Sequence, residues 1–532
     1  MKVLTAQQMQ EVDRLSTDQY QIPSLLLMEN AATQTTLAIE RKHGNVQGKR
    51  ILIVCGKGNN GGDGAAIGRQ LWMRGALVQL VLLAELESTS GDALTNFQIM
   101  KQLAAAGPAI TFHEITSSEV WKEFIRLFGR CDLIIDGLFG TGLQRPASGR
   151  YAEVISDLNR VSTTQSTPII SVDIPSGLSA DRDAIIGPTI QADLTVTFTR
   201  PKPANVLPPA CYQCGQLVVA PIGSPDSLVA ASGATLNLVE PAQIESWLDQ
   251  TRRTPMSHKG TFGHALLVAG SRGKPGAACL AAEAALRAGV GLVTVGTVSS
   301  AQPIIVSHTA EAMTEKLDET NEGTISETAI ERILSLAADR DVLALGPGLT
   351  THESTRRLIQ TVIRRRSRPT LVDADGLNCL APWPEDLSGS GVPLVLTPHP
   401  GEMARLIQST NREVLADRVA VAQAFAIKHS VILVLKGNRT LVASPDGQVY
   451  INPTGNAGLA TAGTGDVLTG MMAGFLAQKP DYPLESVIAA VYLHGLAGDM
   501  AAAQIGMRSM TASDVTRHLG EALRQVANCN EL

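Results

Sequence analysis

The chain has 532 residues, too many for one ordinary hydrophobic core, so its length predicts two or more domains. Its 44% of hydrophobic residues is typical of a globular α/β protein, and its net charge of -6 offers no basic surface for a nucleic-acid backbone. No run approaches the roughly 18 apolar residues of a membrane span, and the N-terminus lacks the apolar core of a signal peptide. We therefore expect a cytoplasmic protein with small-molecule partners, no nucleic-acid partner and no membrane partner.

Two helices are predicted at the start of the first domain, which we place at residues 1–222. Thr5 caps the first helix, and the second covers residues 24–42 with apolar residues at helical spacing. Short β-branched runs then alternate with helical segments, and the predicted strands are residues 50–55, 77–83, 132–136, 168–173 and 193–198. Continuous apolar strands separated by helices predict a parallel sheet covered on both faces.

A second alternating series follows a small, polar segment at residues 223–235, which we interpret as a linker. Its predicted strands are residues 264–270, 291–297, 341–346, 369–375, 393–399 and 431–437. The sequence therefore predicts a second α/β domain at residues 236–532. Ligands of such sheets bind at the carboxyl ends of the strands, so residues that follow the strands are the candidates for function.

The segment GKGNNGGDG, residues 56–64, follows the first predicted strand and precedes a helix. Its glycines satisfy G-x-G-x-x-G, and Glu85 follows the next strand where a ribose-binding acid would lie, so a dehydrogenase is one interpretation. Asp63 argues against it, because a carboxylate near the helix N-terminus would repel a pyrophosphate. A plain helix cap at Asp63 is the alternative without function.

Two other strand ends favour a different ligand. Asp136 begins the Gly-rich stretch DGLFGTGLQRP, and VDIPSGL carries Asp173 and Ser176. Asn60, Asp136 and Ser176 offer the oxygen ligands that potassium or a similar cation requires. Asp173 could then remain free as a proton-transfer group.

These motifs, with NNGGDG at residues 59–64, resemble the NAD(P)HX epimerase domains of the YjeF-N family over about residues 1–222. The resemblance implies a Rossmann-like three-layer sandwich that binds hydrated nicotinamide nucleotide, with Asp173 as the acid/base and Asn60, Asp136 and Ser176 as potassium ligands. It also implies two loops around the substrate, and the full set of expected substrate contacts is Asn59, Asn60, Gly61, Gly62, Asp63, Gly140, Thr141, Gly142, Leu143, Gln144, Arg145, Pro146, Tyr151 and Asp173.

The second domain has no P-loop, so phosphoryl chemistry would need another anion-binding turn. Gly463, Thr464, Gly465 and Asp466 precede an apolar helical run, where backbone N–H groups and the helix dipole favour phosphate. Asp466 would then lie within reach of a hydroxyl that meets this phosphate. A Gly-rich helix start capped by Asp466 is the alternative without function.

This turn resembles that of the ribokinase-like superfamily, and more closely that of the ADP/ATP-dependent NAD(P)HX dehydratases of the YjeF-C family. The matching stretches are residues 258–278, 345–349, 373–378, 397–406, 436–440 and 462–466. The resemblance implies a ribokinase-like three-layer α/β/α domain with ADP or ATP as co-substrate and Mg²⁺ bound with the nucleotide. It implies contacts to the hydrate from Ala277, Gly348, His399 and Asp466, and to the nucleotide from Lys436, Gly437, Asn438, Arg439, Thr440 and Gly465.

Both halves point to the same damaged cofactor, so we predict a bifunctional repair enzyme. It would epimerise the R and S forms of hydrated NADH and NADPH, and would dehydrate the S form with Asp466 as the proton acceptor. A homo-oligomer is expected, and the resemblance favours ADP over ATP. One alternative is a ribokinase-like kinase of a small alcohol. Another is a non-catalytic module, which the presence of Asp136, Asp173 and Asp466 disfavours.

Overall fold

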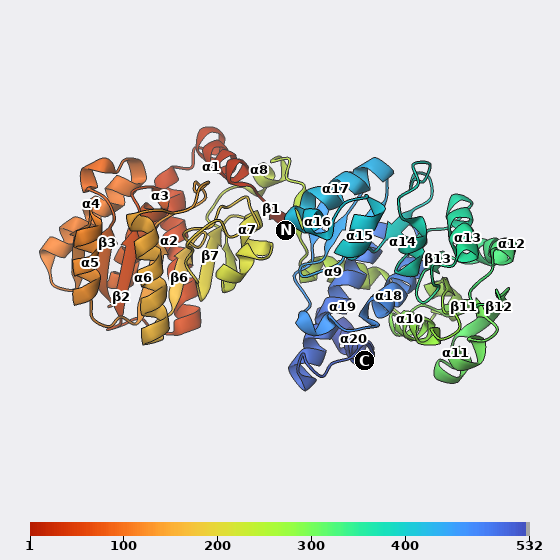
Figure 1. Ribbon diagram of the computed structural model, residues 1–532. Coiled ribbons are helices and arrows are strands. Elements are labelled where there is room, and N and C mark those ends of the chain that lie inside the picture. Colours follow the sequence, from red (N-terminus) through yellow and green to blue (C-terminus); the bar gives the residue numbers. More distant parts are fainter. Residues whose placement is uncertain (528–532) are drawn as a thin grey trace. The chain divides into compact units, whose positions relative to one another are not determined.

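The computed structural model describes residues 1–527 and divides into two compact units, Met1–Leu236 and Asn237–Leu532 (Figure 1). The segment that we interpret as a linker contains helix α8 (Asp226–Ala230). Leu228 and Val229 of this helix are buried against Met9 and Val12 near the start of the chain. The segment therefore contributes a small hydrophobic cluster to the first unit.

The first unit alternates strands and helices, as predicted. Its strands are β1 (Lys2–Val3), β2 (Arg50–Cys55), β3 (Leu77–Leu82), β4 (Ile110–Glu114), β5 (Leu133–Gly137), β6 (Ile169–Val172), β7 (Leu194–Phe198) and β8 (Gln216–Ala220). Its other helices are α1 (Ala6–Tyr20), α2 (Ser24–His43), α3 (Asn59–Met73), α4 (Gly91–Ala106), α5 (Ser118–Leu127), α6 (Arg150–Gln165) and α7 (Pro203–Val206). Thr5 caps α1 and forms a capping box with Gln8, which confirms the predicted start of this helix.

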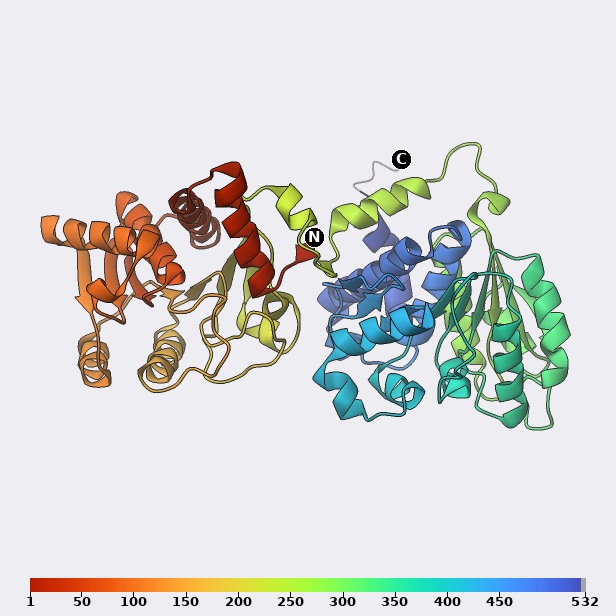
Figure 2. The same cartoon turned by 90° about the horizontal axis from the view of Figure 1, so that it is seen from above.

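The sheet of this unit is parallel, in the order β4-β3-β2-β5-β6-β7-β8. Helices α2, α3 and α4 cover one face, and α5 and α6 cover the other (Figure 2). Side chains alternate along β2, with Ile51 and Ile53 in one core and Leu52 and Val54 in the other. This double burial explains the continuous apolar runs in the sequence. The chain leaves β2 and β5 in opposite directions, which makes a crevice at their carboxyl ends.

The second unit is built on a larger sheet. Its strands are β10 (His264–Val268), β11 (Leu292–Val298), β12 (Met313–Leu317), β13 (Val342–Leu345), β14 (Thr370–Val372), β15 (Leu394–Leu396), β16 (Ile432–Leu435), β17 (Leu441–Ala443) and β18 (Val449–Ile451), and β9 (Leu236–Leu238) lies at the boundary. Its helices are α9 (Pro241–Gln250), α10 (Pro275–Arg287), α11 (Gln302–His308), α12 (Ile330–Ala338), α13 (Glu353–Arg364), α14 (Asp375–Leu380), α15 (Pro400–Leu406), α16 (Asn411–Ala416), α17 (Arg418–His429), α18 (Thr464–Gln478), α19 (Pro483–Ile505) and α20 (Ala512–Val526).

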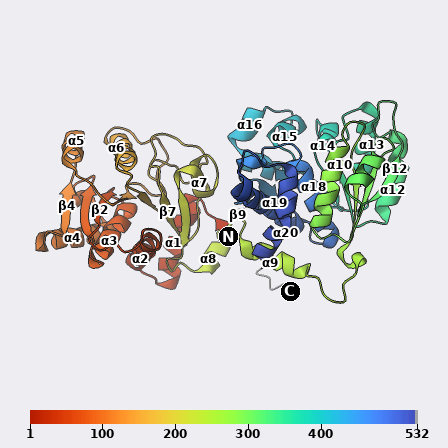
Figure 3. The ribbon, with the colours of Figure 1, turned by 90° about the horizontal axis from the view of Figure 1, so that it is seen from below.

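The strands of the second unit follow the order β18-β17-β16-β15-β14-β13-β10-β11-β12. The pairs from β16 to β12 are parallel, as predicted, but β16-β17-β18 is an antiparallel meander that the sequence did not predict. The connections between these last strands are too short for a parallel crossover. Helix α18 packs closely on α10 and α19 (Figure 3). A second crevice lies between β10 and β13, where the direction of the connections reverses.

Helix α19 differs from the expectation that no segment resembles a membrane span. Among residues 1–527 it is the one helix that is long and apolar enough to cross a membrane, judged by length and composition alone. It packs against α18 and α20, and 72% of its 18-residue apolar window is buried inside the protein. Its apolar composition is thus accounted for by its place in the core of the second unit.

Candidate functional site

A cavity of about 620 Å³ lies in the first unit at the carboxyl ends of β2 and β5. The structure places nine of the predicted substrate contacts in its lining, namely Asn59, Asn60, Asp63, Gly140, Thr141, Gly142, Leu143, Tyr151 and Asp173. Gly61 and Gly62 are buried within α3 and do not line it, and Gln144, Arg145 and Pro146 continue the second predicted loop on the exposed surface. Four charged residues in the lining, Asp13, Lys57, Asp92 and Lys202, were not predicted.

The segment at residues 59–64 is the first part of helix α3, so the prediction of a loop is wrong here. Gly58 is the N-cap, which also rules out a capping role for Asp63. A Cβ atom at Gly61 would lie 1.8 Å from the carbonyl oxygen of Gly56, and one at Gly64 would lie 2.8 Å from Cys55 Sγ. The glycines inside the helix therefore allow it to pack directly on the end of β2.

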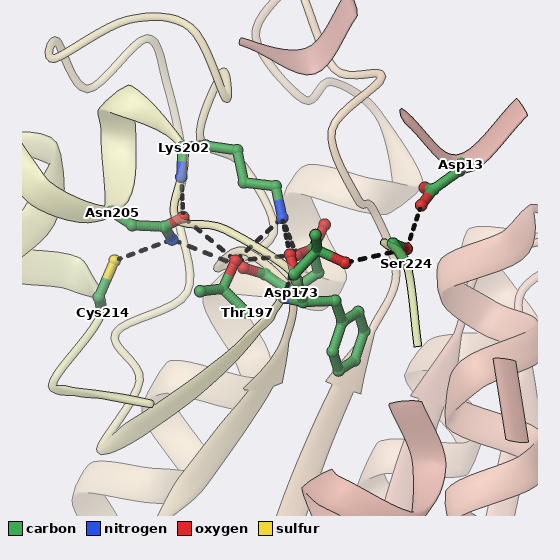
Figure 4. Close-up of polar contacts among 9 residues, drawn as sticks. Asp13, Asp173, Thr197, Lys202, Asn205, Cys214 and Ser224 are labelled. Atoms are coloured by element: carbon green, nitrogen blue, oxygen red, sulfur yellow. Dashed lines mark hydrogen bonds and ion pairs between the residues drawn. The ribbon is translucent and has the colours of Figure 1, made fainter. Parts of the chain in front are cut away.

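Asp173 lies at the end of β6 in a left-handed conformation, with φ of 66°. Its Oδ1 accepts hydrogen bonds from Thr197 Oγ1 at 2.9 Å, from the Phe198 amide at 3.2 Å and from the ammonium of Lys202 (Figure 4). Lys202 is 0% exposed and also donates to Thr197 Oγ1 at 3.0 Å. Its position after the predicted strand at residues 193–198 is the sequence signal that could have identified it.

Asp13 and Asp63 bring two more carboxyl groups to the same cavity. Burial, together with repulsion from Asp173, raises the pKa of Asp13 to about 6. Burial and the charges of Asp173 and Asp13 raise the pKa of Asp63 well above its usual range. Three carboxyl groups from different elements thus share the field of one buried ammonium, that of Lys202. Sequence reasoning missed Asp13 because α1 has the pattern of an ordinary surface helix.

Asp136 and Ser176 are fully buried behind this cavity and contact each other. Ser176 Oγ donates to Asp136 Oδ1 at 2.5 Å, and the Ser176 amide donates to Oδ2 at 2.8 Å. Burial raises the pKa of Asp136, although Ser171 and Ser176 stabilise its ionised form by hydrogen bonds. The buried Nδ2 of Asn60 has no hydrogen-bond partner within the described chain. Since an amide can be turned to present its oxygen instead, these three side chains fit a hard cation.

Two cavities in the second unit meet at the first turn of α18. One, of about 410 Å³, is lined by Asp466 and by the predicted residues Ala277 and Gly348. The other, of about 380 Å³, is lined by Gly465 and by all the remaining predicted nucleotide contacts, namely Lys436, Gly437, Asn438, Arg439 and Thr440. The consecutive residues Gly465 and Asp466 therefore face different cavities at one helix N-terminus.

The buried Asp373 forms an ion pair with the half-buried Lys436 beneath this turn, with Lys436 Nζ at 2.7 Å from Asp373 Oδ1. Thr397 and Thr469 also donate to the Asp373 carboxylate, each at 2.7 Å. Although burial opposes ionisation, Lys436 holds the pKa of Asp373 below its usual range. Burial, followed by the charge of Asp373, raises the pKa of Asp466 to about 6. Asp373 belongs to the family-like stretch at residues 373–378. Its role as partner of Lys436 could not be predicted from that stretch, because the two residues meet only through a tertiary contact.

His399 is the N-cap of α15 and lies outside the lining of both cavities. Its Nδ1 accepts hydrogen bonds from the amides of Gly401 and Glu402, at 3.0 and 3.3 Å. Burial and then the charges of Lys436 and Arg405 lower the pKa of His399. The neutral ring therefore carries its proton on Nε2. Glu402, which was not predicted, lines the 410 Å³ cavity in the place expected for His399.

The fold and these cavities define a protein with two α/β domains, each of which carries carboxylates at the ends of parallel strands. Family models match both halves: "YjeF-related protein N-terminus" at residues 24–204 and "NAD(P)H-hydrate dehydratase" at residues 265–520.

Full-length relatives agree with these matches. A bifunctional NAD(P)H-hydrate repair enzyme of Moorella thermoacetica is 45% identical over 99% of this chain and 97% of its own length. That of Thermofilum pendens is 38% identical over 98% of this chain and 96% of its own. A solved structure of the ADP/ATP-dependent NAD(P)H-hydrate dehydratase from Bacillus subtilis, co-crystallized with ATP/Mg²⁺, is 32% identical, with a TM-score of 0.48, over 55% of this chain and 98% of that one. The chain belongs to the family of bifunctional NAD(P)H-hydrate repair enzymes.

Proposed function

We propose that this chain repairs hydrated NADH and NADPH with two activities. Residues 1–222 would interconvert the R and S hydrates, and residues 236–532 would dehydrate the S hydrate to NAD(P)H at the expense of ADP or ATP. Family membership supports the pairing of the two activities. The observation that carries the dehydratase is the junction at the start of α18, where Gly465 faces one cavity and Asp466 the other.

In the first unit, the hydrate would bind in the 620 Å³ cavity, with its ring near Asp173. Epimerisation requires that the carbon carrying the hydroxyl lose it, or that the ring open, and that oxygen then add to the other face. A carboxylate that moves a proton at this oxygen, as proposed for Asp173, suits either route. Its contacts with Thr197, Phe198 and Lys202 hold it at the cavity.

Potassium would be held by Asn60, Asp136 and Ser176. The unpartnered end of the Asn60 amide, together with the carboxylate and hydroxyl oxygens, supports this ligand set. When bound, the cation would supply positive charge that steadies developing negative charge on oxygen.

In the second unit, the nucleotide would occupy the cavity lined by Lys436, and the hydrate the cavity lined by Asp466. Asp466 would accept the proton of the ring hydroxyl as that oxygen attacks the terminal phosphorus. Phosphate is a better leaving group than hydroxide, so its departure, with loss of a proton from the neighbouring ring carbon, restores NAD(P)H. The N-terminal amides of α18 and the Lys436 ammonium would stabilise the transferred phosphoryl group.

Magnesium would enter with the nucleotide. Within residues 1–527, no group of three or more His, Cys, Asp or Glu side chains could hold a metal ion. Magnesium commonly keeps several waters and binds through substrate phosphates, so few protein ligands are needed. A cytoplasmic location and a homo-oligomeric state belong to the same proposal.

The test is to supply a mixture of hydrate epimers with ADP or ATP and to follow NADH absorbance. Absence of recovery with either nucleotide contradicts the proposal. A kinase of a small alcohol would use the same Asp466, but it would accumulate a stable phosphorylated product instead of free phosphate and NAD(P)H.

A further inference from the structure

Helix α1 brings a carboxyl group into the cavity of the first unit from outside the residues 24–204 matched by the family model. Met9, Gln10 and Asp13 of this helix line the cavity. Asp13 Oδ1 accepts a hydrogen bond from Ser224 Oγ at 3.4 Å, which is a long contact (Figure 4). Its side chain is thus placed by the fold but only weakly bound, which leaves it able to act on a ligand.

Charge balance distinguishes Asp13 from Asp173. Lys202 is fully buried and donates directly to Asp173, whereas Asp13 accepts the long hydrogen bond from Ser224. One ammonium cannot neutralise three carboxyl groups in a cavity of low dielectric, so the others favour protonation. The charged groups that face Asp13 are Asp63 from α3, Asp173 after β6 and Lys202 before α7, and Lys57 and Asp92 line the same cavity.

The reaction itself calls for two such groups. The R and S hydrates carry their hydroxyl on opposite faces of the ring, so a single fixed carboxyl cannot serve both oxygens equally. Asp13 comes from α1 and Asp173 follows β6, so the two carboxyl groups reach one cavity from different elements. Two carboxyl groups with different surroundings in one site can divide the roles of acid and base.

Building on the proposed function, we propose that Asp13 is a second acid–base residue of the epimerase site, beside Asp173, and that Lys202 is the positioning residue that holds the Asp173 carboxylate at the cavity. Asp13 donates its proton to the ring hydroxyl, and the C–O bond breaks with its electron pair, releasing water. The lone pair of the ring nitrogen forms a C=N bond. Water then adds to the other face, the C=N pair returns to nitrogen, and Asp173 accepts the released proton. The reverse reaction exchanges the two roles.

The test uses the full-length protein, one isolated epimer and no nucleotide, and measures its conversion to the other epimer by chromatography. In Asp13→Asn, which keeps the size of the side chain, we expect kcat to fall about 100-fold or more while KM changes little. Asp13→Glu should recover part of the activity. The wild-type rate should fall as pH rises through about 6, the pKa of Asp13, because the acid form is consumed, and this limb should be lost in Asp13→Asn.

The matched control is Glu11→Gln on the same helix, because Glu11 is exposed and pairs with Arg14 on the surface. It should behave as wild type. For the positioning residue, Lys202→Met should lower kcat with little change in KM, since Asp173 loses the ammonium that holds its carboxylate, and Lys202→Arg should restore kcat partly. Thermal unfolding of each variant shows whether the first unit is folded.

The outcomes separate this inference from the proposed function. If wild type converts the epimers and folded Asp13→Asn and Asp13→Glu match it in kcat and in pH profile, the role of Asp13 is overturned and the function stands. If folded Lys202→Met matches wild type in kcat, the role of Lys202 is overturned. If wild type converts neither epimer, the function and this inference fail together.

Discussion

The ammonium of Lys436 lies 2.7 Å from the buried carboxylate of Asp373, directly beside the first turn of α18. A Cβ atom at Gly465 would be 3.6 Å from this ammonium and 3.9 Å from Asp373 Oδ2. The backbone of this first turn therefore lies in van der Waals reach of the ion pair. In the proposed reaction, this approach would bring amide groups and a cation to the same terminal phosphate.

Replacing Asp373 by Asn should disable the second unit while sparing the first. The half-buried Lys436 would lose its nearest carboxylate and keep the more distant Glu402, at 3.8 Å, so we expect a loss of up to roughly 3 kcal/mol in the stability of this unit and a large fall in dehydration. Thermal unfolding and NADH recovery from the S hydrate measure both effects. Asp386→Asn, at an exposed pair with Arg364, is the control and should change neither. Unchanged dehydration in folded Asp373→Asn would contradict the importance of the pair.

Removing the two proposed proton acceptors should give different patterns. Asp466→Asn should stop dehydration of both epimers, because the ring hydroxyl has no acceptor for its proton. Asp173→Asn should leave the S hydrate consumed and the R hydrate untouched, since only interconversion is lost. The final NADH absorbance, with an epimer mixture of known composition, measures the fraction of the hydrate that each variant converts to NADH. The assignment of activities to units fails if both variants lose the same epimer.

Dehydration should rise with pH through about 6 and then level off. Burial and the neighbouring Asp373 charge raise the pKa of Asp466 to about 6, and only its ionised form can accept a proton. The group is therefore inactive below this pH and active above it. The profile of kcat/KM for the S hydrate, at saturating ADP, measures this limb. A rate that stays flat from pH 5 to pH 8 would argue against Asp466 as the base.

The sequence predicted the strands that are buried on both faces and the residues that follow them. β2 was predicted at its observed bounds, because each of its faces meets a separate core. The short strands β12, β17 and β18 were missed, since three to five residues of mixed character carry little periodicity.

The residues of the candidate sites also fall into those that a local sequence pattern identified and those that it missed. Asn60, Asp136 and Asp173 were found because they follow strands in Gly-rich motifs. Asp13 and Lys202 were missed because their importance depends on where the folded chain places them, beside a carboxylate distant in sequence. No local pattern distinguishes Asp13 from an ordinary surface charge, whereas the place of Lys202 after a predicted strand is a local signal that was overlooked.

Exchange of potassium for a large organic cation should slow epimerisation and leave dehydration of the S hydrate unchanged. The proposed ligands Asn60, Asp136 and Ser176 all belong to the first unit. Potassium should also raise the unfolding temperature of wild type, and this effect should be lost in Ser176→Ala because a hydroxyl ligand is removed. Equal stabilisation of wild type and Ser176→Ala would exclude this ligand set.

Gly61→Ala should destabilise the first unit much more than Gly58→Ala. The added methyl group at Gly61 would lie 1.8 Å from the carbonyl oxygen of Gly56, whereas one at Gly58 meets nothing within 4 Å. The clash involves backbone, which cannot rotate away, so α3 must move off the end of β2. We expect this displacement to cost about 2 kcal/mol or more of the free energy of unfolding. Because α3 also carries Asn60 and Asp63, this movement should lower epimerisation as well. Urea unfolding and the conversion of one isolated epimer measure the two effects. Equal stability of the two variants would mean that the close contact between α3 and β2 does not determine the position of this helix.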